Sequence, residues 1–152
     1  MKIYSFINTV VIVNGVELTG WADGDDVIKI SRRTDAASDK IGADGSMMVA
    51  LSADKSGEFV FKLMQTSPSN KYLSGLTALQ ENSPKTFIPC VVLFQDSFRN
   101  DLSTGTLGYI KKQPEVQRGM AGNAQEWTVV VERLDLLLGD PPFLSTATAV
   151  LS

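Results

Sequence analysis

The sequence predicts a mainly β fold: an antiparallel β-barrel or sandwich with one α-helix at about residues 68–82 and a long exposed loop at about residues 32–46. Short β-branched and aromatic runs are separated by Gly- and Asp-rich turns, and only one segment shows convincing helical periodicity. The length of 152 residues suits a single domain. We expect a β domain over residues 1–139 and a C-terminal arm over residues 140–152, which contains Pro141-Pro142 and small residues.

The N-terminal segments predict strands joined by tight turns. Residues 10–13 are β-branched, Asn14-Gly15 is a strong two-residue hairpin signal, and alternation resumes at residues 16–18. Residues 27–31 alternate again. Residues 32–46 are instead rich in charge and glycine, with few large apolar side chains. Loops of this length in a compact domain are usually functional or disordered, so this segment is a candidate for contacts.

The middle of the chain predicts a second hairpin. Residues 47–52 alternate, residues 54–57 form a turn, and large apolar side chains then line one face of residues 58–63. Cross-strand pairing of these large side chains would hold the two strands together.

The helix follows this hairpin. Ser67 can accept a hydrogen bond from an otherwise unpaired backbone amide, and Pro68 lacks that amide, so both residues suit the first turn. Apolar side chains then recur on one helical face, at Tyr72, Leu73, Leu76 and Leu79. The rest of the chain predicts an apolar strand buried on both sides, a weaker strand, a loop and a strong strand, at residues 87–94, 102–110, 114–125 and 127–134.

The composition excludes several kinds of chemistry. The chain has no histidine and one cysteine, Cys90, which excludes Ser-His-Asp and Cys-His catalysis, His- or Cys-rich zinc sites and disulfide frameworks. The net charge of −3 argues against a protein that wraps nucleic acid. No apolar run resembles a signal peptide or a membrane span. We expect no catalytic, cofactor or metal residues, no membrane partner, and a reduced thiol.

Three local motifs have simple interpretations. Asp23-Gly24-Asp25-Asp26 fails as a calcium loop, because Val27 and Thr34 occupy the fifth and twelfth positions, so we interpret it as a solvated turn. Residues 42–46 are glycine-rich but lack the Lys-Ser/Thr of a phosphate loop and precede a strand, which indicates a tight turn. Lys111-Lys112 is too small a basic patch to predict nucleic-acid binding and is interpreted as solvent-exposed.

Residues 41–80, IGADGSMMVALSADKSGEFVFKLMQTSPSNKYLSGLTALQ, resemble tail tube proteins of contractile-tailed (myovirus-type) bacteriophages. The likeness includes an Ile-Gly-Ala-Asp-Gly-Ser turn, a Lys-Ser-Gly turn and a Leu-x-x-Thr-Ser-Pro-x-Asn segment, at residues 41–46, 55–57 and 63–70. It continues in order through most of the chain, at residues 4–6, 112–114, 126–128 and 138–139. The arm at residues 140–152 departs from the family pattern.

The resemblance implies a structural, non-enzymatic subunit of the virion tail, assembled in the cytoplasm of the host bacterium. Six copies would form a ring whose inner sheets join into one barrel around a channel. Rings would stack into a tube, with the long loop of each ring docking on the next. Tape-measure protein would fill the channel before double-stranded DNA passes through it during ejection, and a contractile sheath would surround the tube.

Within this interpretation, the exposed loop supplies candidate contacts between subunits and rings: Arg32, Arg33, Asp35, Asp39, Lys40 and Asp44. Asp23, Asp25 and Asp26 are candidate lumen acids, because cations lining a bore would bind DNA phosphates. Two alternatives stay open. One is a ring protein of a related contractile injection or secretion apparatus that carries effectors. The other is a carboxylate-based hydrolase on a β scaffold, although the sequence selects no acid pair for it.

Overall fold

The computed structural model describes residues 5–96 and 101–139 of the chain, so the predicted arm at residues 140–152 lies outside the described residues. Its elements, in chain order, are η1 (Phe6–Asn8), β1 (Thr9–Val13), β2 (Val16–Glu17), β3 (Ile28–Arg32), β4 (Ala37–Ile41), β5 (Met47–Leu51), β6 (Gly57–Met64), α1 (Ser69–Asn82), β7 (Cys90–Asp96), β8 (Asp101–Lys112) and β9 (Ala124–Leu137). The prediction of a mainly β fold with one α-helix is confirmed.

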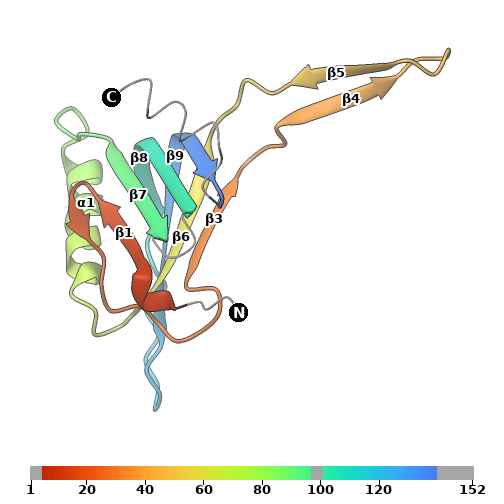
Figure 1. Ribbon diagram of the computed structural model, residues 1–152. Helices are drawn as coiled ribbons and strands as arrows, with labels where there is room; N and C mark the ends of the chain where they lie inside the picture. Colours follow the sequence, from red (N-terminus) through yellow and green to blue (C-terminus); the bar gives the residue numbers. More distant parts are fainter. Residues whose placement is uncertain (1–4, 97–100, 140–152) are drawn as a thin grey trace, which may run out of the picture.

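Seven strands form one antiparallel sheet in the order β2-β1-β7-β8-β9-β6-β3, and β4 and β5 form a separate two-stranded sheet. The large sheet curves, and α1 packs along one side of it (Figure 1). Because β2 and β3 are the two ends of the strand order, the described strands form no closed barrel. Of the two predicted architectures, the sandwich-like one fits.

The predicted hairpin at the start of the chain is confirmed. Val13 pairs with Val16, and the turn residues Asn14 and Gly15 have φ values of 50° and 82°. Both values lie in the left-handed region that a two-residue hairpin turn requires, and asparagine and glycine adopt that region readily. The Asn14 side chain also accepts a hydrogen bond from the Val91 amide at 2.8 Å, which connects this turn to β7.

The predicted long loop and second hairpin need correction. Residues 32–46 are largely exposed, as predicted, but Arg32 ends β3 and residues 37–41 form β4. β5 pairs with β4, whereas the sequence had indicated pairing between residues 47–52 and 58–63. β6 pairs instead with β3 and β9. Alternation identified each strand correctly, but it does not specify the partner, which is decided by burial of the large β6 side chains.

The core lies where β6 and β9 pair. Phe59 is opposite Val129 and Phe61 is opposite Trp127, and all four side chains are fully buried or nearly so. The Trp127 indole N–H donates a hydrogen bond to the side-chain Oδ1 of Asn70 at 2.9 Å, so its polar atom is satisfied. Gly105 of β8 packs directly on this core, because a Cβ there would lie 2.7 Å from a Phe59 ring carbon.

The predicted helix is confirmed with nearly the predicted bounds. The Ser67 hydroxyl accepts a hydrogen bond from the Ser69 amide at 3.2 Å, as expected for a residue at a helix start. Leu73 is fully buried but Leu79 is 53% exposed, so the apolar face is shorter than its spacing indicated. The Gln80 amide group makes two 3.0 Å hydrogen bonds with the backbone N–H and C=O of Ile110, which attach α1 to β8.

β7 differs from its prediction. The apolar run at residues 87–94 was expected to be buried on both sides, yet Val91 is 47% exposed while Cys90 and Val92 are fully buried. The strand therefore has one buried and one exposed face at this point. Cys90 is a free, buried thiol, and the surrounding protein raises its pKa by desolvation.

Candidate assembly interface

The β4–β5 hairpin projects away from the rest of the molecule (Figure 1). Its register places Ala37 opposite Leu51, Asp39 opposite Val49 and Ile41 opposite Met47, so these six residues share one face. Four large apolar side chains on that face are exposed by 57–83%: Ile41, Met47, Val49 and Leu51. We call these four residues the hairpin apolar face. An apolar surface of this kind on a two-stranded ribbon is typical of a site that binds another protein surface.

The tip of the hairpin is held by Asp44. Its Oδ1 atom accepts hydrogen bonds from the Ser46 hydroxyl at 2.6 Å and from the Ser46 amide at 3.0 Å. These hydrogen bonds lower the pKa of Asp44, the hydroxyl having the larger effect. Gly45 has a φ of 85°, and the Gly42 amide donates to the Ser46 carbonyl at 2.7 Å. The predicted tight turn at residues 42–46 is therefore confirmed, and it forms the hairpin tip.

The base of the hairpin has the same arrangement, in which an aspartate accepts two hydrogen bonds from the serine two residues later. Asp54 Oδ1 accepts hydrogen bonds from the Ser56 hydroxyl at 2.6 Å and the Ser56 amide at 2.9 Å. The Ser56 hydroxyl is again the main cause of the lowered pKa of this carboxyl. Thr34, on the incoming chain, donates to the other Asp54 oxygen at 3.2 Å. The base is thus connected across both chain segments, and it supports an otherwise isolated projection.

The six charged contact candidates all lie on or beside this projection. Arg32 ends β3, Arg33 and Asp35 lie at the base, Asp39 and Lys40 lie within β4, and Asp44 holds the tip. The structure spreads them along the hairpin and does not gather them into one cluster.

Sequence reasoning missed the apolar residues of this surface. Residues 47–52 had been assigned to a hairpin with residues 58–63, so their exposure was not anticipated. The signal was present in Asp44-Gly45, a dipeptide that favours a two-stranded hairpin when strand-forming residues flank it. Those flanking residues here are Ile41 and Met47, which the structure places opposite one another.

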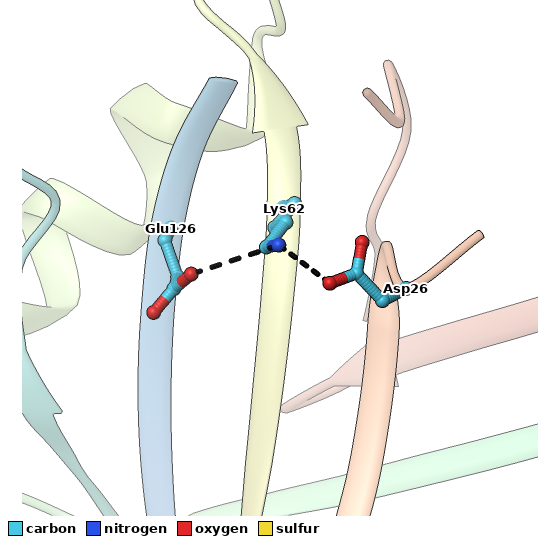
Figure 2. A network of polar contacts seen from close by, with 3 residues as sticks. All are labelled: Asp26, Lys62 and Glu126. Carbon is cyan, nitrogen blue, oxygen red and sulfur yellow. Dashed lines mark hydrogen bonds and ion pairs between the residues drawn. The ribbon is translucent and has the colours of Figure 1, made fainter. Parts of the chain in front are cut away.

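Of the three candidate lumen acids, Asp26 lies in an ion-pair network. Lys62 Nζ lies 2.8 Å from an Asp26 oxygen and 4.0 Å from a Glu126 oxygen (Figure 2). The hydrogen bond between Lys62 and Asp26 lowers the pKa of Asp26 and raises that of Lys62. Asp23 and Asp25 are exposed in the adjoining turn. Asp26 therefore differs from the other two acids, because its charge is compensated by Lys62.

The same sheet face contains a second ion pair. Alternation along β6 buries Phe59 and Phe61 on one side and places Glu58 and Lys62 on the other. Lys111 Nζ lies 3.6 Å from a Glu58 oxygen, so this member of the Lys111-Lys112 patch is paired with an acid. Lysines of β6 and β8 on this face therefore have carboxylate partners, and their positive charge is locally compensated.

No group of three or more side chains that could hold a metal ion gathers within the described residues. In the described part of the chain, no helix has the length and apolar character needed to cross a membrane. What remains is a set of surfaces: an exposed apolar hairpin, two sheet ends and a polar sheet face.

An open β-sheet with a projecting, exposed apolar hairpin is typical of a subunit that binds other protein surfaces. A family model described as Bacteriophage PhiTE tail tube protein matches residues 1–139, and the chain belongs to this family. The resemblance to phage tail tube proteins is thereby confirmed, and the chain is a structural protein of the virion tail. The match ends where the predicted arm begins.

Solved structures support the fold. A chain of the sheath–tube complex of PVC, an extracellular contractile injection system, in the extended state has a TM-score of 0.56 and 9% identity, covering 86% of this chain and 88% of that chain. The sheath/tube terminator of PVC in the extended state scores 0.60 with 10% identity, covering 90% and 97%. The tube-terminating cap of the anti-feeding prophage scores 0.55 with 6% identity, covering 91% and 93%. No curated protein matches the sequence.

Proposed function

We propose that the chain forms hexameric rings that stack into the phage tail tube, and that the β4–β5 hairpin of each subunit docks on a neighbouring subunit. The observation that carries this proposal is the hairpin apolar face. Burying a large apolar side chain is worth about 1.5–3 kcal/mol, so docking four of them supplies much of the energy that a stable contact needs. The isolated chain leaves this surface in water.

Ring closure is supported by the sheet ends. β3 and β2 terminate the strand order, and a terminal strand presents backbone groups that can pair with another chain. Each subunit has two different ends, so head-to-tail pairing generates a closed ring when the rotation between copies divides the circle evenly. Tape-measure protein, double-stranded DNA and a contractile sheath are the proposed partners, and the host bacterial cytoplasm is the proposed place of assembly.

The polar sheet face formed by the consecutive strands β8, β9 and β6 is the proposed bore wall. Lys62 and Lys111 on this face lie beside carboxylates, so phosphates would find little uncompensated positive charge. In this proposal Asp23 and Asp25 add negative charge near the bore, whereas Asp26 mainly neutralises Lys62.

Electron microscopy tests the ring and stacking proposal. Purified protein is expected to form rings or tubes. A variant in which residues 35–52 are replaced by two glycines should give rings or smaller species that fail to stack, because it removes the hairpin and keeps its base. Thr34 and Asp54 already lie within hydrogen-bonding distance, so this short connection can close. Tubes of normal length from this variant would contradict the role of the hairpin.

The bore-wall proposal has its own test. Changing both Asp26→Asn and Glu126→Gln removes the partners of Lys62, and assembled tubes should then retain short duplex DNA in a filter-binding assay. A matched control, Glu17→Gln with Glu81→Gln, changes net charge equally but on β2 and α1, outside the proposed bore wall and the hairpin. Equal DNA retention by the two double variants would rule out this placement of the bore.

A tube of a contractile injection apparatus is the second candidate, favoured by the fold shared with PVC and anti-feeding prophage proteins. The two functions differ in cargo. Particles isolated from the producing bacterium should contain tubes attached to DNA-filled heads if the chain serves a phage. Headless particles that carry protein would favour the second candidate.

A further inference from the structure

A groove of about 650 Å³ opens between β3 and the ends of β7, β8 and β9. Its walls are mainly apolar, with contributions from Ile28, Ile30, Phe94, Leu136 and Leu138. Its acids include Asp23, Asp25 and Asp101, and none of the described lining residues carries a positive charge. The volume lies in the range that proteins use to hold small ligands or a short peptide segment.

Ser103 gives a second indication that the groove is incomplete in one chain. Its side chain lines the groove and is fully buried, yet its hydroxyl has no hydrogen-bond partner among the described residues. A buried polar group without a partner costs about 1–3 kcal/mol, so such groups are normally satisfied in a finished assembly. A peptide backbone inserted into the groove would provide a partner.

The loop between β8 and β9, residues 113–123, has the complementary chemistry. It extends beyond the sheet as a narrow projection, away from the β4–β5 hairpin (Figure 1). Val116 is 74% exposed and Met120 is fully exposed, so two apolar side chains have no cover. Arg118 lies between them in sequence, and it donates a local hydrogen bond to the Gln117 carbonyl at 2.8 Å.

We infer that the β8–β9 loop of one copy inserts into the groove of a second copy of this chain, with Val116 and Met120 against the apolar walls and Arg118 beside the groove acids. Charge complementarity selects residues 116–120 of the loop as the occupant, because the described lining of the groove carries acids and no cation. Arg118 is the one charged side chain in this stretch, which Glu115 precedes. The hairpin apolar face fits less well, since Asp39 lies on that face and would meet the acids of the groove.

The contact is heterologous, because it joins a loop on one copy to a groove on another. A head-to-tail contact of this kind extends a ring or a stack without using the hairpin. The inference rests on the proposed function, since it requires copies of the chain to assemble. It adds a receiving site and its ligand segment, which the docking of the hairpin does not specify.

Disulfide trapping between two variants tests the inference. One full-length chain carries Met120→Cys, and a second, with a larger affinity tag, carries Leu138→Cys. Both positions are exposed, so folding should persist, and Cys90 is fully buried and should not compete. After mixing, assembly and mild oxidation, the mixed disulfide should form at least several-fold faster than between Met120→Cys and Leu79→Cys, a matched exposed position on α1.

Charge exchange provides the second measurement. Arg118→Glu should slow the trapping about two- to five-fold, the usual range for an exposed ion pair, and Asp25→Arg in the partner copy should restore it. Lys85→Glu is the matched control and should leave the rate unchanged, because Lys85 is exposed outside the loop. Val116→Asp should slow the trapping about ten-fold or more, since it removes the other apolar anchor of the proposed contact.

The outcomes separate this inference from the proposed function. Tubes in the microscope together with equal trapping rates for Leu138→Cys and Leu79→Cys would overturn the loop-in-groove contact and leave the tube proposal intact. Absence of tubes, with no preferential trapping, would overturn both. Preferential trapping that Arg118→Glu weakens and Asp25→Arg rescues is the result expected.

Discussion

The β6–β9 pair and the β4–β5 pair are both antiparallel and both rich in large apolar side chains, yet their surroundings are opposite. Phe59 and Phe61 of β6 are fully buried, whereas Leu51 of β5 is 83% exposed and Met47 is 61% exposed. The first pair stabilises one chain. The second pair gains its burial only when another molecule covers it. Apolar alternation therefore serves folding in one region and, in the proposed function, assembly in the other.

The largest effect that separates the two regions should come from truncating an apolar side chain in each. Phe59→Ala is expected to lower the free energy of unfolding by about 3–5 kcal/mol, because it leaves a cavity in the core. Leu51→Ala should change it by less than about 0.5 kcal/mol, since the side chain contacts mainly water. Urea denaturation of unassembled subunits, followed by circular dichroism, measures both. A comparable loss in the two variants would mean that the hairpin is part of the core.

Adding a charge to the hairpin tests whether its apolar face is needed for assembly. Val49→Asp should raise the concentration needed for assembly about ten-fold or more, because Val49 belongs to the hairpin apolar face. Ala50→Asp is the matched control, since Ala50 pairs with Ser38 on the other face. Sedimentation of assembled protein gives the threshold for each variant. Equal thresholds would show that this face is not the docking side.

Two glycines provide a smaller effect within the folded body. Gly105→Ala should lower the free energy of unfolding by about 1–3 kcal/mol, because the new Cβ would lie 2.7 Å from atoms of Phe59 and Val131. Gly75→Ala on α1 should raise it by about 0.5–1 kcal/mol, as nothing lies within 4 Å and alanine favours the helix. Thermal unfolding should move in opposite directions for the two variants. A shift of the same sign would contradict the packing described for β8.

The smallest effect concerns pH and the hairpin turns. The pKa values of Asp44 and Asp54 are lowered in the folded chain from the ordinary 3.8, so their stabilisation is complete above about that pH and is lost as the pH falls through the lowered values. The Ser46 and Ser56 amide resonances should shift together below pH 3.8, before the core signals change. In Asp44→Asn the Ser46 shift should disappear while that of Ser56 persists. Simultaneous loss of core and turn signals would mean that the turns do not titrate independently.

Much of the fold could be predicted because it depends on local chemistry. Asn14-Gly15 specified a turn, and Ser67-Pro68 specified the start of a helix. The partner of residues 47–51 could not be predicted, because alternation is the same whether a strand pairs within the core or outside it. Whether the strands close into a barrel could not be predicted from the sequence either, since closure depends on the curvature of all seven strands.

The projecting hairpin was anticipated as an exposed charged segment, but its apolar face was not anticipated. The charged residues of the segment from Arg32 to Asp44 do lie on or beside the hairpin, yet Val49 and Leu51 were assigned to pairing with residues 58–63. The network of Asp26, Lys62 and Glu126 joins residues on different strands, and no spacing rule connects them. Such contacts exist only after β6 and β9 have paired and the turn before β3 has packed beside them.

The two hydrogen bonds between Gln80 and Ile110 have a consequence for how far a sheet can grow. β7 pairs with β8 only as far as Gly108, so Ile110 would otherwise present an open backbone to solvent. The side-chain amide of Gln80 bonds both the N–H and the C=O of Ile110, as a neighbouring strand would. A strand from another molecule therefore finds no free backbone group at Ile110 with which to pair. The helix thus blocks strand addition beside β8, and it leaves β2 and β3 as the edges at which another strand can extend the sheet.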